Sequence, residues 1–372
     1  MSAERVFNFS AGPAAMPLEC LEEAAAEMTN WRKSGMSVIE CSHRSKPWGA
    51  EMAEAEANLR QILSIPDTFH VLFLAGGASL RFSEVCFNLI GDAKCVDYLC
   101  TGTWSSKAMA EATRLAFPGV EVHSVAGKPD ANPIDVKDKS TWTVHDDAAY
   151  FYYCDNETIQ GIEFQQFPDV KPPLVIDMSS NFLSKPITQW DKVGCIFACA
   201  QKNFGPAGMT IVVVRKDLLE QRKLKPFCPI TLDWRIQVAN KCLYNTPPAF
   251  PIYFANLVFK WILKKGGIAA LQEINRQKAA KVYEAIEKSP HFVNKVKPEW
   301  RSVMNIPFFR PDGYEVKNPD LDLKFINFCA ERKIQTIKGH VSVGGFRASI
   351  YNSCPMEAVD ALCKAIEEFP GF

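Results

Sequence analysis

The amino-acid sequence predicts an α/β fold: a large, mainly parallel, seven-stranded sheet followed by a smaller C-terminal α/β domain. First, short β-rich runs alternate with helical ones, which is typical of parallel sheets. Second, several runs are apolar throughout, as in Met209–Val214, which indicates strands covered on both faces. Third, a length of 372 residues suits two domains. The seven runs are His70–Leu74, Lys94–Leu99, Val120–Val125, Ala149–Tyr153, Leu174–Ile176, Gly194–Cys199 and Met209–Val214.

Helices are predicted on both sides of this region. Apolar residues at helical spacing predict a helix over Leu18–Lys33, which Gly35 ends, and a second helix over Glu51–Leu63. After the last run, two further helical stretches, Tyr253–Lys264 and Ile268–Lys288, lead the chain away from the sheet.

The C-terminal region repeats the α/β pattern on a smaller scale. Its predicted elements are a strand over Val303–Phe309, a helix over Leu321–Arg332, a strand over Arg347–Tyr351 and a helix over Pro355–Phe369. We place the domain boundary at the glycine pair 266–267. This gives a large domain over residues 15–265 and a small domain over residues 266–372, with the N-terminal segment 1–14 packing near the small one.

Composition and charge exclude several classes of protein. Hydrophobic residues make up 47% of the chain and charged residues 23%, which excludes disordered and fibrous proteins. The 42 basic and 42 acidic residues balance, so no general attraction to nucleic acid or to an anionic membrane is expected. The start of the chain lacks the features of a signal peptide, and no apolar segment is long enough to cross a membrane. We therefore expect a cytoplasmic protein with small-molecule partners.

The cysteines and histidines do not form a metal-binding pattern. Thirteen cysteines are scattered through apolar runs, and the six histidines form no HxxxH pair. We expect reduced thiols, mostly buried as small hydrophobic side chains, and no bound metal.

Candidate site residues are those that follow the predicted strands, because ligands of parallel α/β sheets bind beyond the carboxyl ends of the strands. The stretch Ala75–Ser79 follows the first run and precedes a helical stretch. Its small residues and the helix N-terminus favour phosphate binding. Taken alone, the stretch fits a tight turn without a ligand equally well.

Two charged residues occupy equivalent positions. Asp177 ends an apolar run, where a carboxylate either caps a local turn or faces a protonated partner. Lys202 follows another apolar run, where partial desolvation favours covalent chemistry at its amine. The alternative is a structural lysine whose ammonium reaches solvent.

Together these places match the requirements of pyridoxal 5′-phosphate. This cofactor needs a phosphate cup, an amine for its aldehyde and a carboxylate that keeps the pyridine nitrogen protonated. Trp104, after the run that ends at Leu99, offers a flat surface for stacking on the cofactor ring. An ordinary core tryptophan is the alternative.

With these residues in place, the sequence resembles the phosphoserine aminotransferase family, a group of class V, fold-type I pyridoxal-phosphate-dependent aminotransferases. The resemblance covers essentially the whole chain. It implies the fold-type I architecture, with the cofactor in the large domain, and a homodimer with shared active sites. The most specific segments are Ser42–Arg44, Tyr153–Thr158, Asp177–Ser184, Ala200–Asn203 and Tyr244–Pro248.

The resemblance also implies a role for each candidate residue. Lys202 would bind the cofactor aldehyde covalently, Asp177 would pair with the pyridinium nitrogen, and Trp104 would stack on the ring. Thr158 would bind the phenolic oxygen of the cofactor, and Arg347 would bind the α-carboxylate of the substrate. The residues implied for the cofactor phosphate are Ala78, Ser79 and Gln201, together with Asn245 and Thr246 of the partner subunit.

The sequence departs from the family in the pocket for the distal anion of the substrate. His43, Arg44 and His340 correspond to residues that face this anion. The family pattern reads Gly-His-Arg, but here Val341 follows His340, so an arginine that helps to bind phosphate is missing. Arg81 stands where the family usually has glutamine, and it either restores the lost charge or lies on a solvated helix face.

The predicted reaction is amino transfer from L-glutamate to 3-phosphohydroxypyruvate, giving O-phospho-L-serine and 2-oxoglutarate, in serine biosynthesis. One alternative keeps the chemistry but uses another acidic three-carbon oxo acid, such as 3-sulfopyruvate, whose sulfonate carries one charge fewer. A second alternative is a non-enzymatic binding or scaffold protein that kept the fold.

Overall fold

A seven-stranded sheet forms the centre of the computed structural model, which describes residues 5–130, 133–313 and 316–372. Its strands are β2 (Phe69–Ala75), β3 (Cys95–Leu99), β4 (Glu121–Ser124), β5 (Phe151–Cys154), β8 (Leu174–Asp177), β9 (Val193–Cys199) and β10 (Met209–Arg215). They lie in the order β2-β10-β9-β8-β5-β3-β4. Strand β10 runs antiparallel to both of its neighbours, and every other pairing is parallel. The predicted mainly parallel sheet is confirmed.

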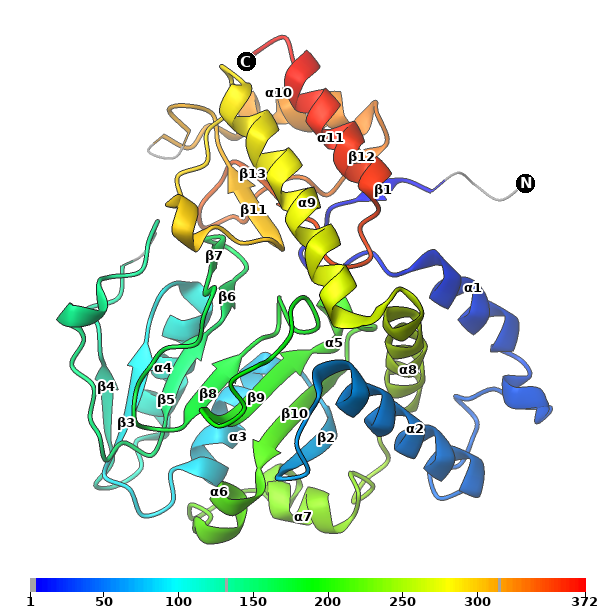
Figure 1. Ribbon diagram of the computed structural model, residues 1–372, viewed down its shortest axis with the longest axis vertical. Coiled ribbons are helices and arrows are strands. Elements are labelled where there is room, and N and C mark those ends of the chain that lie inside the picture. The colour runs from blue at the N-terminus through cyan, green and yellow to red at the C-terminus, as the bar shows by residue number, and fades with distance from the viewer. Residues whose placement is uncertain (1–4, 131–132, 314–315) are drawn as a thin grey trace.

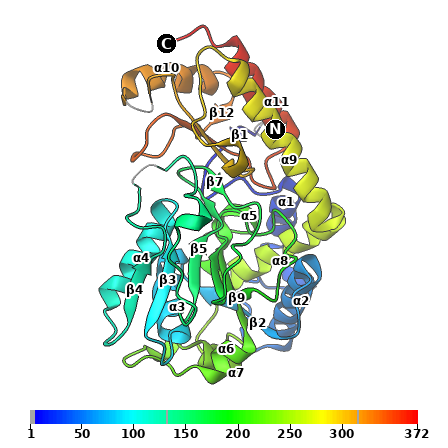
Figure 2. The same cartoon turned by 60° about the vertical axis from the view of Figure 1, so that its left-hand side comes forward.

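Helices cover both faces of this sheet, as Figure 2 shows. Helices α2 (Lys46–Leu63) and α8 (Ala249–Lys264) cover one face, and α3 (Ala78–Leu89) and α4 (Thr103–Leu115) cover the other. Successive side chains of a strand point to opposite faces, so Val213 packs into the core under α2 and α8 whereas Val214 packs into the core under α3 and α4. This double covering explains why the runs are apolar throughout.

The carboxyl ends of five strands meet at one edge of the sheet. Strands β2 and β9 run in the same direction because both are antiparallel to β10, and β9, β8, β5 and β3 are parallel in turn. The short helix α5 (Ala200–Asn203) begins directly after β9. The segments that were candidates in the sequence therefore share this edge.

A smaller unit lies at the carboxyl edge of the sheet (Figure 1). Strands β11 (Asn305–Phe308) and β13 (Phe346–Ser349) pair antiparallel, while β1 (Phe7–Asn8) pairs parallel with β12 (Ile334–Gln335). Its helices are α9 (Gly267–Lys288), α10 (Pro319–Ala330) and α11 (Met356–Glu368). The domain limits and the packing of segment 1–14 stay predictions, and residues 1–4 of that segment lie outside the described residues.

Two predicted helices differ from those observed. Helix α1 (Leu18–Glu27) ends before Lys33, because Arg32 and Lys33 adopt positive φ angles of 51° and 61° that an α-helix does not allow. Helix α2 begins earlier than predicted because the Ser45 hydroxyl accepts a hydrogen bond from the Trp48 amide at 3.3 Å. The remaining elements are the hairpin β6 (Asn156–Glu157) and β7 (Ile162–Glu163), and the helices α6 (Lys216–Gln221) and α7 (Trp234–Ala239).

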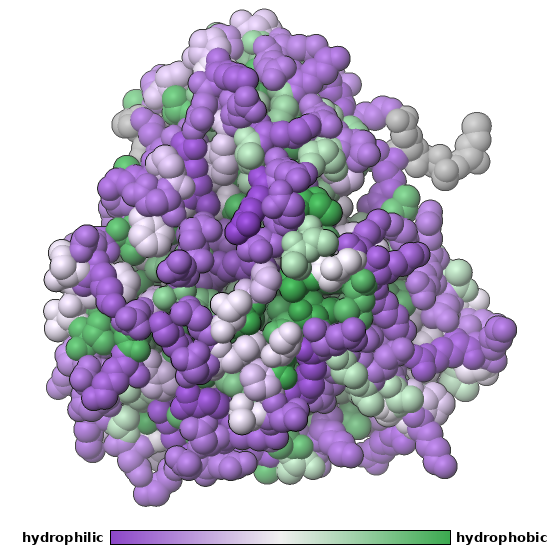
Figure 3. Space-filling view, in the orientation of Figure 1, coloured by the Kyte–Doolittle hydropathy of each residue, from purple (hydrophilic) through white to green (hydrophobic). Residues whose placement is uncertain are grey.

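The surface in the orientation of Figure 1 is mainly hydrophilic, as Figure 3 shows, with hydrophobic residues gathered near α8 and the start of α9. Most large apolar side chains lie instead in the two cores of the sheet and in the core of the smaller unit, which includes Phe9 from the N-terminal segment. In the part of the chain that the structure describes, no helix is both long and apolar enough to cross a membrane.

Candidate active site

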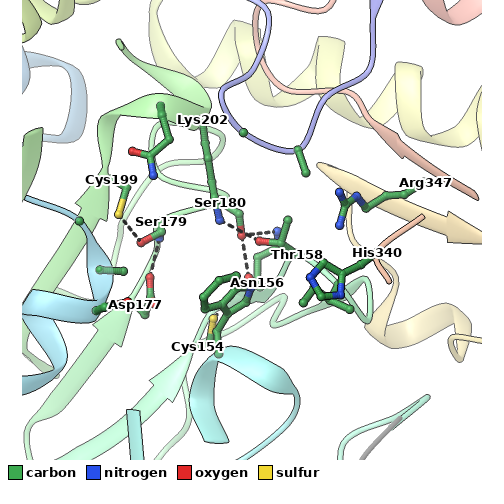
Figure 4. Close-up of a pocket in the computed structure, with 18 residues that line it drawn as sticks. Cys154, Asn156, Thr158, Asp177, Ser179, Ser180, Cys199, Lys202, His340 and Arg347 are labelled. Atoms are coloured by element: carbon green, nitrogen blue, oxygen red, sulfur yellow. Dashed lines mark hydrogen bonds between the residues drawn. The ribbon is translucent and has the colours of Figure 1, made fainter. Parts of the chain in front are cut away.

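A cavity of about 340 Å³ lies at the carboxyl edge of the sheet, between the sheet and the smaller unit (Figure 4). Segments that follow β2, β3, β5, β8 and β9 supply most of its lining. The predicted site residues that line it are Ala78, Ser79, Trp104, Thr158, Asp177, Gln201, Lys202, His340 and Arg347. The fold thus brings together residues that are up to 269 positions apart, from Ala78 to Arg347.

The amine of Lys202 points into this cavity. It donates a hydrogen bond to the Thr158 hydroxyl at 2.9 Å, and it lies 5.7 Å from the centroid of the Trp104 ring. No carboxylate among the described residues forms an ion pair with it. A half-buried amine without an anionic partner is available for a covalent bond to an aldehyde.

Asp177, the last residue of β8, is 2% exposed. Its Oδ1 accepts a hydrogen bond from the Ser179 amide at 2.8 Å, so one oxygen caps the local turn, while Oδ2 has no hydrogen-bond partner within the described residues. Burial raises the pKa of this carboxyl group. A protonated ring nitrogen beside Oδ2 would stabilise its ionised form.

Arg347 lies on β13, across the cavity from Asp177 (Figure 4). Its Nε is buried and has no hydrogen-bond partner in the described parts of the chain. Burial lowers the pKa of the guanidinium group, so the charge is poorly compensated and favours a bound carboxylate. His340 lines the same side, and its Nδ1 lies 2.7 Å from the Ser342 hydroxyl.

Comparison with known proteins identifies the family. Residues 6–362 match the aminotransferase class-V family. A phosphoserine aminotransferase from Janthinobacterium sp. (strain Marseille) is 44% identical over 370 residues, which cover 98% of each chain. The chain belongs to the phosphoserine aminotransferases of the class-V aminotransferase family. The predicted family, fold class and enzyme class are therefore confirmed, and the hypothesis of a non-enzymatic scaffold protein is set aside.

Solved structures agree with this assignment. A phosphoserine aminotransferase from Trichomonas vaginalis, described as bound to pyridoxal phosphate, is 70% identical with a TM-score of 0.97, covering 98% of this chain and 100% of that chain. The phosphoserine aminotransferase from Bacillus circulans subsp. alkalophilus is 40% identical with a TM-score of 0.91, covering 99% of both chains.

Sequence reasoning missed Glu157, which holds Trp104 in place. This carboxylate is fully buried and accepts hydrogen bonds from the amides of Trp104 and Ser105, each at 2.9 Å, and from the Ser105 hydroxyl at 2.6 Å. Gly102 permits this approach, since a Cβ there would lie 2.5 Å from the Glu157 carboxyl carbon. The only sequence signal is an acidic residue shortly after an apolar run.

A polar network joins the two walls of the cavity in this phosphoserine aminotransferase. The Asn156 amide donates to the Ser180 hydroxyl and to Asn305 Oδ1, each at 2.8 Å. Asn305 in turn donates to the hydroxyls of Ser349 and Tyr351, at 2.9 and 3.0 Å. These bonds connect the segment after β5 with β13, the strand that carries Arg347. The sequence gave no signal for this network.

Four predicted site residues do not line the cavity of their own chain. His43 and Arg44 precede α2, whereas Asn245 and Thr246 lie between α7 and α8. Arg44, Asn245 and Thr246 are exposed, and His43 is half-buried. Their predicted roles therefore stay predictions, and any role at such a cavity requires a second subunit.

The structure corrects both expectations for Arg81. Its side chain is 1% exposed and forms a buried ion pair with Glu84 at 2.9 Å. It also donates to the Ala75 carbonyl oxygen at 2.8 Å and does not line the cavity. Arg81 thus lies neither at the distal anion nor on a solvated helix face, because Glu84 and the end of β2 hold it inside the large domain.

Proposed function

We propose that this protein transfers the amino group of L-glutamate to 3-phosphohydroxypyruvate, with pyridoxal 5′-phosphate as its cofactor. The products are O-phospho-L-serine and 2-oxoglutarate, in serine biosynthesis. The observation that carries the proposal is that one cavity holds the Lys202 amine, the Asp177 carboxylate and the Arg347 guanidinium. The names of the relatives at 44% and 70% identity support the choice of substrates.

The lining of the cavity fits each part of pyridoxal 5′-phosphate. The N-terminus of α3, which begins at Ala78, and the hydroxyl of Ser79 would bind the phosphate. Thr158 would bind the phenolic oxygen, Trp104 would cover one face of the ring, and Asp177 would pair with the ring nitrogen. When bound, the cofactor supplies an electron sink for negative charge at the substrate α-carbon.

The residues of the chain then have separate tasks. Lys202 holds the cofactor aldehyde until the substrate amine displaces it, and its free amine then moves a proton to or from the substrate α-carbon. Asp177 keeps the ring nitrogen protonated. Arg347 orients both substrates through the α-carboxylate that they share, with two parallel hydrogen bonds.

We infer further that the enzyme is a homodimer in which residues of each subunit complete the other's site. Asn245 and Thr246 are exposed, and so are large hydrophobic side chains near the residues with no place in their own cavity: Ile39 at 62% and Tyr244 at 39%. A two-fold dimer is the commonest closed assembly. A monomeric holoenzyme with full activity, measured by analytical ultracentrifugation and assay at the same concentration, would contradict this inference.

The cytoplasm is the proposed location. All thirteen cysteines are free thiols, which suits a reducing compartment. Fluorescence microscopy of the tagged protein in its native cell would test this location.

The experiment that tests the reaction is an acceptor panel with glutamate as the common donor. We expect 3-phosphohydroxypyruvate to give the highest kcat/KM for the wild type, ahead of 3-sulfopyruvate and oxaloacetate. The Val341→Arg variant serves as a comparison, because it restores the arginine of the family pattern. A clear preference of the wild type for 3-sulfopyruvate would reject the proposed acceptor while leaving the transaminase chemistry intact.

A further inference from the structure

The end of the cavity at His340 faces a shortage of positive charge. A substrate phosphate carries up to two negative charges and binds best to cations. Val341, which replaces the arginine of the family pattern, is 85% exposed. Arg81 is neutralised by Glu84, at a distance of 2.9 Å, inside the large domain. The charge must therefore come from another residue.

Lys107 on α4 lies close to this end of the cavity. It follows Trp104 by three residues, so both side chains lie on one face of the helix, and helical side chains lean toward the N-terminus. Its Nζ is 4.8 Å from the centroid of the Trp104 ring, which lines the cavity. The ammonium group thus lies over a residue of the cavity wall.

The charge of Lys107 also reaches His340. Desolvation lowers the pKa of His340 most, and the positive charges of Arg347 and Lys107 lower it further. Within the described residues no carboxylate forms an ion pair with Lys107. The exposed side chain has a flexible stem, so that its ammonium can approach an anion at the cavity rim.

Other lysines near this end are engaged. Lys317 donates to the carbonyl oxygen of Ser342 on the turn that follows His340. Lys202 donates to Thr158 at 2.9 Å and has its proposed task at the cofactor. Lys107 is the cation that combines an unpaired ammonium group with contact to the cavity wall.

We propose that Lys107 is a specificity-determining residue: its ammonium group, together with His340, binds the distal phosphate of the substrate in place of the arginine that Val341 replaces. This inference rests on the proposed function, since it names a residue that binds the acceptor. It assigns no role in proton transfer to Lys107.

Binding of unreactive analogues to the holoenzyme tests this role. The first probe, 3-phosphoglycerate, has a carboxylate and a phosphate but no amino or oxo group. The second probe, glutarate, has two carboxylates. We expect Lys107→Gln to raise the Kd of 3-phosphoglycerate about tenfold and that of glutarate less than about threefold, measured by calorimetry, because a dianion loses more from the missing charge. Steady-state assays should show the same selectivity in KM, with little change in kcat.

Two further variants separate charge from structure. Lys107→Arg keeps the positive charge and should restore the wild-type Kd for 3-phosphoglycerate to within about threefold. Lys94→Gln removes an exposed lysine before β3, at the opposite edge of the sheet, and should change neither Kd.

The possible outcomes distinguish the two proposals. If the wild type binds 3-phosphoglycerate and Lys107→Gln binds it equally well, the role of Lys107 is overturned and the proposed acceptor stands. Equal weakening of both analogues would also overturn it, because that result indicates a disturbed Trp104. A wild type that binds glutarate but not 3-phosphoglycerate would overturn both proposals.

Discussion

The buried carboxylate of Glu157 accepts two hydrogen bonds from Ser105, one from its amide at 2.9 Å and one from its hydroxyl at 2.6 Å. Glu157 follows β5, and Ser105 lies in the first turn of α4. The carboxylate thus satisfies donors at a helix N-terminus, where negative charge is favourable. This contact fixes Trp104, the neighbour of Ser105, against the cavity.

Replacing Glu157 should therefore affect both stability and the cofactor site. We expect Glu157→Ala to lower the free energy of unfolding by about 2–3 kcal/mol, because buried donors lose their partner. Cofactor affinity should fall as Trp104 moves. Urea unfolding and a cofactor titration check these effects. Glu111→Gln, which removes an ion pair with the exposed Arg114, is the matched control and should cost less than about 1 kcal/mol. Equal stability of the two variants would contradict the role of Glu157.

Lys202→Ala should abolish both covalent cofactor binding and transamination. The absorbance near about 400 nm that a cofactor bound covalently to a lysine gives should disappear, and activity should fall by about 10⁴-fold or more. Lys192→Ala removes a half-buried lysine that pairs with Asp169 at 3.0 Å, away from the cavity, and should change neither property. Wild-type absorbance in the Lys202→Ala protein would rule out this lysine as the attachment point.

Asp177→Asn separates cofactor binding from turnover. The asparagine oxygen can still accept the hydrogen bond from Ser179, but it no longer stabilises a protonated ring nitrogen. We expect the variant to bind some cofactor and to lose about 10²- to 10⁴-fold in kcat. Activity close to that of the wild type, in protein shown by absorbance to hold the cofactor, would argue against a pairing with the ring nitrogen.

Arg347→Ala should raise KM for both half-reactions, because both substrates present an α-carboxylate. Loss of a charge-assisted contact predicts an increase of about 10- to 100-fold for glutamate and for the acceptor alike. Arg301→Ala, which removes an arginine paired with Glu287, is a control outside the cavity. If only one of the two KM values rose, Arg347 would bind a group that the substrates do not share.

The pair of Arg81 and Glu84 predicts a specific dependence of stability on pH. Burial raises the pKa of Glu84 to about 7, although Arg81 and the indole N–H of Trp234, at 2.7 Å, favour the ionised form. A folded-state pKa above the unfolded value means that this group contributes stability fully below about pH 4.5. That contribution is lost as pH rises to about 7.

Glu84→Gln should remove this loss. Between about pH 5 and pH 8 the free energy of unfolding of the variant should rise relative to that of the wild type, by about 1–3 kcal/mol. The slope is the readout, because the variant also deprives Arg81 of its charged partner at every pH. Urea unfolding at several pH values checks it, and parallel profiles for the two proteins would contradict the assigned pKa.

Local signals in the sequence were sufficient for several elements and partly misread for others. Helix α2 carries a readable start in Ser45 and Pro47, a hydroxyl cap followed by proline in the first turn, which predicts the observed Lys46 start better than apolar spacing does. The early end of α1 had no such signal, because the positive φ of Arg32 accompanies the burial of Trp31 and its contact with Tyr253. Contacts between distant segments override local preference there.

The sequence by itself determined the strands and the chemistry at their ends. Apolar runs mark strands buried on both faces, and a charged residue directly after such a run must lie at the edge of the sheet, which is why Asp177 and Lys202 were identified. Only the tertiary structure decided that Glu157 holds α4, that Arg81 is neutralised inside the domain and that Lys107 reaches the cavity wall. Those outcomes depend on side-chain direction and on partners far apart in the chain, which exist only after the strands have paired.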